Sequence, residues 1–500
     1  MSSSENNFSG ILPDSFKLKW IYLASAAFIG INTFLIAREF YWFTLLPALL
    51  FILLLSVIAL DKVLLIIVFL TPLSYNLKTS DVGAALSVPT EPLLFRTMML
   101  FFFRLLYEGK FDKRISHHPI TIAIYFYLAW MCITTMTSTM PLVSFKFLIS
   151  KLWFLCSFYF LATQLFKDYK NVKRYIWLYI ISLTIVIIYT IYNHAQGGFL
   201  EQPAHVAMVP FYNDHTSYGA VLAMFLPVLV AFLVNKQYSR TIKLFTGILL
   251  VAFIMATILS YTRAAWVGLA LAVALFIVYQ FRIRFIFLAL AGSALLLYVF
   301  ANREQLLIKL EKNKVTSSAD LAQHVQSISN ITNDASNRER INRWQSALRM
   351  FDVRPVFGWG PGTYQFQYAP FQFSYEKTDI STNSGNKGNA HSEYIGPLAE
   401  QGIFGLITFL GILIAVYYRG SILYHSLEDK EMKRLVLVIL LGLSTYYLHG
   451  TLNNFLDTDK ASAPFWGFVA MIAAIDVYHS GKKKPVVSKD EPGSENAHAE

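Results

Sequence analysis

Residues 242–260 read IKLFTGILLVAFIMATILS, and RAAWVGLALAVALFIVYQ follows at 263–280 after only two intervening residues. Each run is close to the roughly 20 apolar residues that carry a helix across a bilayer. Similar runs recur along the 500-residue chain, which is 55% hydrophobic and only 15% charged. A soluble domain is about a quarter charged. The pattern therefore predicts an all-α polytopic membrane protein.

The apolar runs define up to fourteen spans. The third is short and the fourth is interrupted by charge, so 12–14 transmembrane helices are expected. The predicted spans are 20–37, 41–60, 62–75, 90–106, 119–138, 145–166, 174–193, 217–235, 242–260, 263–280, 284–301, 395–418, 434–452 and 461–478.

Lysines and arginines concentrate in alternate short loops, and this bias sets the expected orientation, because cytoplasmic loops are enriched in both residues. The predicted topology begins with a cytoplasmic N-terminus at 1–19 and transmembrane helices over 20–301. A large periplasmic loop at 302–394, C-terminal transmembrane helices over 395–478 and a disordered cytoplasmic tail at 479–500 follow. The net charge is +11, and the lysines and arginines of these short loops are expected to anchor the chain at the membrane lipids. It therefore does not indicate a nucleic-acid partner.

The large loop contains NRERINRWQSALRMFDVRPVFGWGPGTYQF from residue 337. Amphipathic helices are predicted near 303–314 and 336–351, followed by a Gly/Pro turn at 358–362. The second of these helices carries a basic ridge of Arg338, Arg340, Arg343 and Arg349. Arginine suits the bidentate binding of a phosphate or diphosphate. The alternatives are a solvated face or contact with lipid headgroups.

A histidine follows at the end of the same loop, in NAHSEYIGPLAEQGIFGLI from residue 389. A neutral imidazole accepts a proton near pH 7, so His391 is the candidate general base. Glu393 and Glu400, seven residues apart on one helical face, are alternative bases or partners of the imidazole. The plainer interpretation makes His391 an interfacial hydrogen-bonding residue.

Two further candidates stand at the mouths of spans. Arg263, in LSYTRAAWVGL, either extends to the membrane interface or serves a functional site. His215 lies in FYNDHTSYGA, where Asp214 reads first as a helix cap and His215 as a possible substrate contact.

The remaining cysteines and acidic residues give little evidence for a metal. Cys132 and Cys156 lie in apolar segments and are expected to be packing residues. Asp457 and Asp459, in an outer loop, are expected to face solvent, and their signal for metal binding is weak. Neither a metal site nor a cofactor is predicted.

Together these motifs resemble the O-antigen ligase and polymerase superfamily over roughly residues 205–415. The resemblance rests on R-x-x-R-W-x-x-A-x-x-M, RPxxGWGPGTY, H-S-E-Y and LAEQGIFGL, with LSYTRAAWVGL similar to the family's span-mouth motif. By position, Arg263, Arg340 and Arg343 match the family's arginines, His391 its loop histidine and Glu400 its acidic residue. Two departures are His391-Ser392 where many members have His-Asn, and Y-T-R-A-A in place of S-R-G-A.

The resemblance implies a metal-independent, inverting glycosyltransferase of the type-C membrane class in the bacterial inner membrane, without a cofactor. Such enzymes take a glycan from undecaprenyl diphosphate at the periplasmic face. A ligase passes it to lipid A core or a protein, whereas a polymerase passes it to another glycan repeat. The sequence does not separate the two.

Two other classes stay open. A transporter or flippase would use the loop as a gate, and it would be expected to have paired charges at mid-membrane. Charged residues within the predicted spans are sparse, with Lys151 and Arg96 as the exceptions. A non-catalytic role in assembly is the last alternative. Trp344, Trp359 and Tyr364 line the sugar path in the enzymatic interpretation and form loop core in the plainer one.

Overall fold

The computed structural model describes residues 15–47, 59–78, 85–109, 111–282, 302, 335–378, 381 and 388–481. The chain forms two compact units, Met1–Val63 and Leu64–Glu500. The first holds helix α1 (Ser15–Ala37) and the short 3-10 helix η2 (Trp42–Leu45), and α3 (Leu60–Leu70) crosses the boundary.

The second unit contains the other elements, and it is almost entirely helical where it is described. They are β1 (Tyr75–Lys78), β2 (Ala85–Val88), α4 (Thr90–Glu108), α5 (Lys113–Ser116), α6 (Pro119–Met136), α7 (Pro141–Leu155), η3 (Cys156–Leu161), α8 (Ala162–Leu165), α9 (Tyr169–Gln196), α10 (Glu201–Ala204), α11 (His215–Leu233), α12 (Arg240–Leu259), α13 (Arg263–Gln280), α17 (Ala335–Val353), α18 (Tyr364–Gln367), η4 (Ala369–Phe371), η5 (Ser374–Glu376), α19 (Ile395–Ser426), α20 (Lys430–His449), α21 (Asp459–Ala474) and η6 (Ile475–His479).

Local sequence explains where many of these helices begin. Asp168, Asp214 and Asp429 each accept hydrogen bonds from backbone N–H groups of the first turn of α9, α11 and α20. Such caps satisfy donors that have no partner within the helix. Pro119 and Pro141 occupy the first turns of α6 and α7, where the missing N–H of proline costs nothing.

The predicted fold class is confirmed. Eight of the described helices are long and apolar enough to cross a membrane; they are α6, α7 continued through α8, α9, α11, α12, α13, α19, and α21 continued through η6. The predicted span at 284–301 and most of the one at 41–60 lie outside the described residues, so the total of 12–14 stays a prediction. The helix expected near 303–314 also lies outside them.

One element was not predicted. The span expected at 62–75 ends as helix at Leu70, and the chain then forms an antiparallel pair of strands. Tyr75 faces Val88 and Lys78 faces Ala85 across this β1–β2 hairpin. The apolar run is therefore shorter as a helix than its composition suggested.

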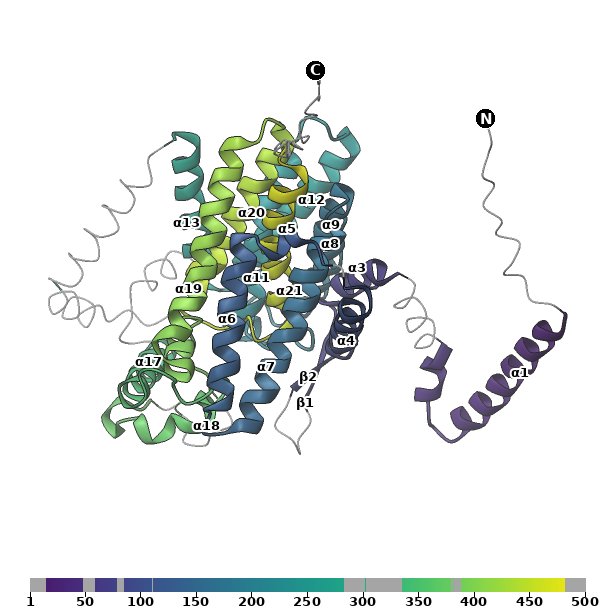
Figure 1. The fold of residues 1–500 in the computed structure, drawn as a ribbon, viewed down its shortest axis with the longest axis horizontal. Helices are drawn as coiled ribbons and strands as arrows, with labels where there is room; N and C mark the ends of the chain where they lie inside the picture. Colours follow the sequence, from purple (N-terminus) through teal and green to yellow (C-terminus); the bar gives the residue numbers. More distant parts are fainter. Residues whose placement is uncertain are drawn as a thin grey trace, which may run out of the picture. The chain divides into compact units, whose positions relative to one another are not determined.

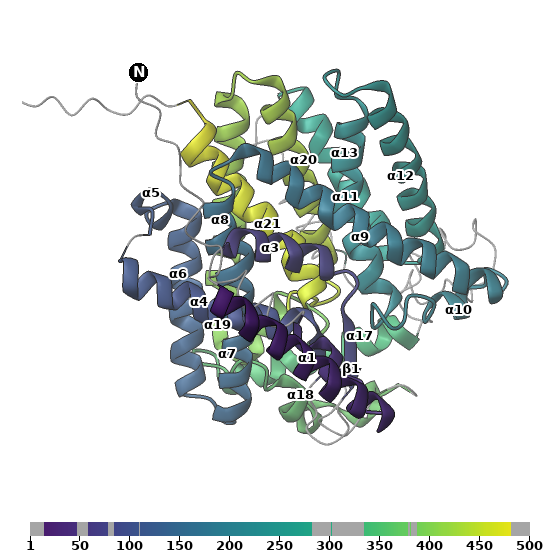
Figure 2. The same ribbon diagram turned by 90° about the vertical axis from the view of Figure 1, so that its right-hand side faces the viewer.

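Small residues allow close approach at the centre of the helix bundle, where α11, α13, α20 and α21 pack together (Figures 1 and 2). A Cβ at Gly268 would lie 2.7 Å from the Thr445 carbonyl oxygen, and one at Gly442 would lie 2.5 Å from that of Met224. Backbone contact through small residues is typical of helix packing in membranes. Helix α21 is buried along its whole length.

The two ends of the bundle differ. We call one the site end, which holds residues 194–214, the α17–α18 region and the loop 450–458; α17, α18 and the β1–β2 hairpin lie at this end in Figure 1. The opposite, basic end holds the loops at 111–118, 166–168, 234–239 and 427–429. The order in which the chain crosses the membrane and the compartment that each end faces stay predictions.

Candidate functional site

A cavity of about 720 Å³ opens at the site end. Its walls come chiefly from α7, from the segment 388–401 that leads into α19, and from the loop before α21. The ionisable residues that line it are Glu91, Lys146, Lys151, His391, Glu393, Glu400 and Asp457. A cavity of this volume with converging polar groups is the usual form of a ligand-binding site.

His391 stands on the wall of this cavity in an unusual backbone conformation. Its φ of 47° lies in the left-handed region, which non-glycine residues seldom occupy. Its backbone N–H donates to Asn389 Oδ1 at 3.0 Å, and Ser392 Oγ accepts from the backbone N–H groups of Tyr394 and Ile395 at 3.3 Å each. These contacts hold the backbone of His391 immediately before α19 begins.

The charges around His391 favour its neutral form. Burial, together with the charges of the Arg343 and Arg340 guanidiniums, lowers the pKa of His391 to about 4, while Asp214 opposes this shift. The electrostatic partners come from α17 and from the cap of α11. Three segments that are far apart in the sequence therefore converge on one imidazole.

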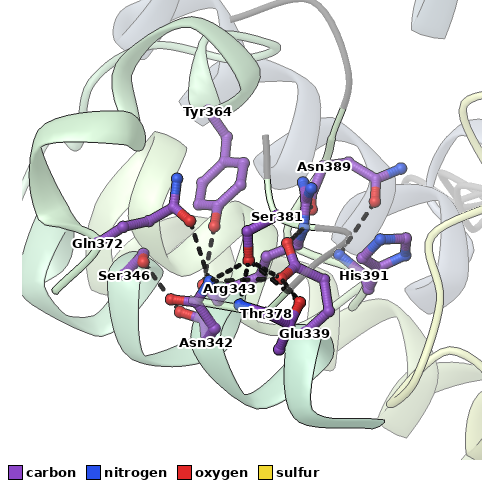
Figure 3. A network of polar contacts seen from close by, with 10 residues as sticks. All are labelled: Glu339, Asn342, Arg343, Ser346, Tyr364, Gln372, Thr378, Ser381, Asn389 and His391. Atoms are coloured by element: carbon purple, nitrogen blue, oxygen red, sulfur yellow. Dashed lines mark hydrogen bonds and ion pairs between the residues drawn. The ribbon is translucent and has the colours of Figure 1, made fainter. Parts of the chain in front are cut away.

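Arg343 lies behind the His391 segment and not on the cavity wall. Its side chain is 3% exposed, and its Nε donates to Glu339 Oε1 at 2.8 Å (Figure 3). Nη1 donates to the Asn389 carbonyl oxygen at 3.3 Å. A Cβ at Gly388 would lie 1.3 Å from Nη1, so only glycine allows the chain to cross the guanidinium this closely. Arg343 therefore supports the segment that carries His391.

Glu339 is itself held by several donors. Thr378 Oγ1 donates to Glu339 Oε2 at 2.9 Å, and Ser381 Oγ makes a shorter contact with the same oxygen. Although burial raises the pKa of Glu339, the hydrogen bonds from Ser381 and Thr378 and the charge of Arg343 lower it more. Figure 3 shows this network joining α17 to the loop that precedes His391.

The four arginines of the basic ridge predicted on α17 have different surroundings in the structure. Arg338 is exposed and Arg340 is half-buried. Arg349 pairs with Glu376, with Nη1 and Oε2 2.7 Å apart, and its guanidinium lies 3.7 Å from the centre of the Phe373 ring. Arg349 thus fastens α17 to the segment around η5, whereas the charges of Arg343 and Arg340 both act on His391.

Arg263 and His215 begin two neighbouring helices. Arg263 is the first residue of α13, and the preceding Thr262 donates through Oγ1 to the His215 carbonyl oxygen at 2.9 Å. Asp214 Oδ1 accepts the backbone N–H groups of Thr216 and Ser217 at 2.8 Å each, as the capping interpretation predicts. The His215 ring stacks on His205 with the ring centres 4.1 Å apart.

Glu400 joins the two loop motifs. Its Oε2 and Oε1 accept the backbone N–H groups of Gly362 and Tyr364, both at 2.9 Å. Gly402, with φ 70° and ψ −168°, interrupts α19 beside the Val356 carbonyl. The GWGPGTY turn and the LAEQG segment are therefore locked together, and the carboxylate of Glu400 supports this turn at the cavity wall.

Two aromatic residues of the loop also differ in position: one lines the cavity and the other packs in the loop core. Tyr364 lines the cavity and donates its hydroxyl to the Arg343 carbonyl oxygen at 2.8 Å. Trp359 packs on the loop core and donates from Nε1 to the Met350 carbonyl oxygen at 2.9 Å.

The sequence did not predict that Lys151, Asp457 and Glu393 come together at the cavity wall. Lys151 Nζ lies 2.7 Å from Asp457 Oδ1 and 2.9 Å from the Leu456 carbonyl oxygen. Glu393 Oε1 accepts the Tyr446 hydroxyl at 2.7 Å and the Leu456 N–H at 2.8 Å. Burial raises the pKa of Glu393 to about 7, against the lowering effect of Lys151. A lysine inside an apolar span indicates that an acidic partner lies nearby. Which residue is that partner cannot be told from the neighbouring sequence.

The expectation that Asp459 faces solvent is wrong. Its side chain is fully buried, and Oδ2 accepts from Ser74 Oγ at 2.7 Å and Thr90 Oγ1 at 2.5 Å. Lys460 Nζ lies 3.3 Å from Asp459 Oδ1. Burial of a carboxylate requires such partners, and these fasten α21 to the β1–β2 hairpin. Among the described residues, we find no group of three or more His, Cys, Asp and Glu side chains placed to hold a metal ion.

Comparison with known proteins places these residues in a family context. Residues 248–410 match the family model described as O-antigen ligase, and this stretch includes Arg263, Arg340, Arg343, His391 and Glu400. An uncharacterized protein of Haemophilus influenzae is 24% identical over 207 residues, which are 40% of this chain and 49% of that protein. The alignment thus spans about half the length of that relative. The resemblance to the O-antigen ligase superfamily is confirmed, and the match supports an O-antigen ligase-type function in general.

Proposed function

We propose that this protein transfers a glycan from a polyprenyl-diphosphate carrier, such as undecaprenyl diphosphate, to a hydroxyl acceptor. One observation carries the proposal: His391 faces a cavity of about 720 Å³ and is flanked by the charges of Arg340 and Arg343. A neutral imidazole beside fixed positive charge suits a reaction that moves a proton while an anionic group leaves.

In the proposed step, the acceptor oxygen attacks the anomeric carbon of the donor sugar from the face opposite the diphosphate. The new glycosidic bond forms as the bond to the diphosphate oxygen breaks, and the carrier diphosphate leaves with that electron pair. The acceptor proton passes to a ring nitrogen of His391. This displacement inverts the anomeric centre and uses neither a cofactor nor a metal ion.

The arginines would stabilise the negative charge of the leaving diphosphate. Arg340 and Arg263 are the proposed direct contacts, with the exposed Arg338 and with His215 at the edge of the site. Arg343 acts as a positioning residue, because its guanidinium is buried against Glu339 and the Asn389 carbonyl. Glu400 is also a positioning residue, since both of its carboxylate oxygens accept backbone N–H groups of the GWGPGTY turn.

Donor binding would also activate the base. The pKa of His391, lowered to about 4 by burial and by Arg343 and Arg340, makes it a weak base in the free protein. A bound diphosphate adds negative charge beside the same guanidiniums and therefore raises the pKa of the imidazole. His391 would accept a proton readily only when the donor is in place.

The location belongs to the proposal. We place the protein in the bacterial inner membrane with the loop 302–394 in the periplasm and both termini in the cytoplasm, because lysines and arginines concentrate in the short loops of the basic end and in the helix turns beside them. Reporter fusions at positions 325 and 485 should report opposite compartments. The same compartment for both would contradict this orientation.

The decisive test is transfer in vitro by the purified protein with a lipid-linked oligosaccharide donor, in EDTA, with three acceptors offered separately. Product on lipid A core or on a protein indicates a ligase, and product on a second lipid-linked repeat indicates a polymerase. Loss of activity in EDTA that a divalent cation restores would contradict the metal-independent step. Transport of the lipid-linked glycan without any new glycosidic bond would favour the flippase alternative.

A further inference from the structure

A second, smaller cavity of about 200 Å³ lies beside the main one at the site end. The two share Asn389, Asn454 and Asp457 as wall residues. Because the amide Oδ1 of Asn389 accepts the backbone N–H of His391 at 3.0 Å, the shared wall adjoins the proposed base directly.

We propose that this smaller cavity is a saccharide subsite that binds one uncharged sugar residue next to the reacting centre. The proposal rests on the proposed function, because a glycan must be present for the subsite to act in transfer. It differs from the arginine cluster in the chemistry that it recognises, which is that of hydroxyl groups and not of phosphate.

The polar atoms of the wall suit sugar hydroxyls. Amides dominate it, with Asn76 and Asn213 from different segments joined by a hydrogen bond of 2.8 Å between Nδ2 and Oδ1. Asn454 Nδ2 donates to Asp457 Oδ2 at 3.2 Å. Its Oδ1 is buried and has no hydrogen-bond partner within the described part of the chain. A buried acceptor without a partner costs stability, and a ligand hydroxyl would satisfy it.

The charges of the wall also argue for an uncharged ligand. The Asp457 carboxylate pairs with Lys151 at 2.7 Å, and the Lys460 ammonium lies 3.3 Å from Asp459. Asp214 is used as the cap of α11. The two ion pairs leave no unmatched positive charge, and Asp214 adds a negative one, so the cavity lacks the surplus of positive charge that a diphosphate would require. Tyr212 and Phe455 supply apolar ring surface to the same wall.

The test compares two variants from different walls with a matched control. Asn454→Ala and Asn213→Ala each remove one amide of the subsite. Asn171→Ala removes an amide at the basic end that is partly buried, as Asn454 is, and whose Nδ2 donates to the Leu165 carbonyl oxygen at 3.1 Å. The control therefore reports the general effect of losing a partly buried amide in this bundle.

Steady-state transfer should show a rise in KM of about three- to tenfold for one substrate in both subsite variants, the size expected when a single hydrogen bond is lost. A rise for the donor places the sugar of the lipid-linked glycan in the subsite, and a rise for the acceptor places the acceptor sugar there. Unchanged KM values for both substrates, or an equal rise in Asn171→Ala, would overturn the proposal.

A second measurement does not depend on transfer. The oligosaccharide released by mild acid from the lipid-linked donor is added to the full-length protein in detergent, and saturation-transfer NMR records its ring protons. Wild type and Asn171→Ala should give saturation transfer, and Asn454→Ala should give clearly less. Equal signals from all three proteins would contradict the subsite even if transfer is never observed. Failure of the subsite proposal is therefore distinguishable from failure of the proposed function.

Discussion

The two ends of the helix bundle treat their charged residues differently. At the site end, Arg343 and Glu339 are buried together behind the His391 segment, and the buried Lys151 pairs with Asp457 at the wall of a large cavity. At the basic end, Arg114 pairs with Asp112 while its side chain is 61% exposed. Burying charge is costly unless each group is paired. Charge at the site end is therefore best explained by a site, and charge at the basic end by orientation in the membrane.

The basic end has one exception, which sharpens the contrast. Asp476 in η6 is buried and contacts both Arg419 and His118, the latter at 3.2 Å. These residues tie α6 and α19 to η6 at the end of α21. A buried ion pair can therefore serve helix packing, so a buried pair alone does not mark a functional site.

The largest effect is expected at the imidazole. His391→Ala should lower transfer by about 10²- to 10⁴-fold, the usual contribution of a general acid–base group. Its thermal unfolding temperature in detergent should stay close to that of wild type, because the side chain lines a cavity. Full activity of this variant would move the base to Glu393, whose pKa is raised to about 7 by burial, and Glu393→Gln would then be the inactive variant.

The next effect is on stability. Arg343→Ala leaves Glu339 buried without its cation, and removal of one partner of a buried pair costs roughly 3–5 kcal/mol of unfolding free energy. The double variant Glu339→Gln with Arg343→Gln leaves no unpaired charge and should recover most of the loss. Thermal unfolding of the three proteins measures this order. Equal unfolding temperatures for the single and double variants would show that the pair is not a structural support of the His391 segment.

A smaller loss of activity is expected from the arginines proposed to contact the donor. Arg340→Ala and Arg263→Ala should each weaken donor use about tenfold or more, because a charge-assisted hydrogen bond contributes roughly 1.5–3 kcal/mol. Lysine at either position should rescue only partly, since an ammonium cannot bind two oxygens as a guanidinium does. Donor titrations at fixed acceptor measure this effect. Wild-type output from both alanine variants would rule out the diphosphate contact.

The pH dependence separates the free protein from its donor complex. The pKa of His391 is lowered to about 4 by burial and by Arg343 and Arg340, so kcat/KM should fall only as the pH drops toward that value. A bound diphosphate raises this pKa, so kcat should fall at a higher pH than kcat/KM does. His391 also binds fewer protons folded than unfolded between pH 6.5 and 4, so its contribution to stability is lost as pH falls through this range. Coincident acid limbs would contradict activation by the donor.

The smallest effect is expected at the basic end. Arg114→Ala removes an exposed ion pair, which contributes about 0–1 kcal/mol. Transfer should stay at the wild-type level, and the unfolding temperature should change little. A loss of transfer comparable to that of Arg340→Ala would mean that the two ends are coupled, and the contrast between them would fail.

The sequence alone determined the class of fold and the order of its parts. Runs such as 242–260 specify membrane helices because each helix satisfies its own backbone hydrogen bonds and only apolar side chains suit lipid. The helix at 336–351 was also predicted, and the structure has α17 at Ala335–Val353. The arginine and histidine motifs identified the loop that holds the candidate site, because their residue types are tied to the chemistry of anions and protons.

Only the tertiary structure decided which groups meet. Lys151 and Asp457 are far apart in the chain, as are Ser74 and Asp459, and no local periodicity links them. The division of the α17 arginines into Arg349 on Glu376, Arg343 on Glu339 and Arg340 near His391 likewise depends on how the loop folds back. Side-chain patterns report one helix at a time, whereas a cavity and its charges arise where several helices and loops pack together.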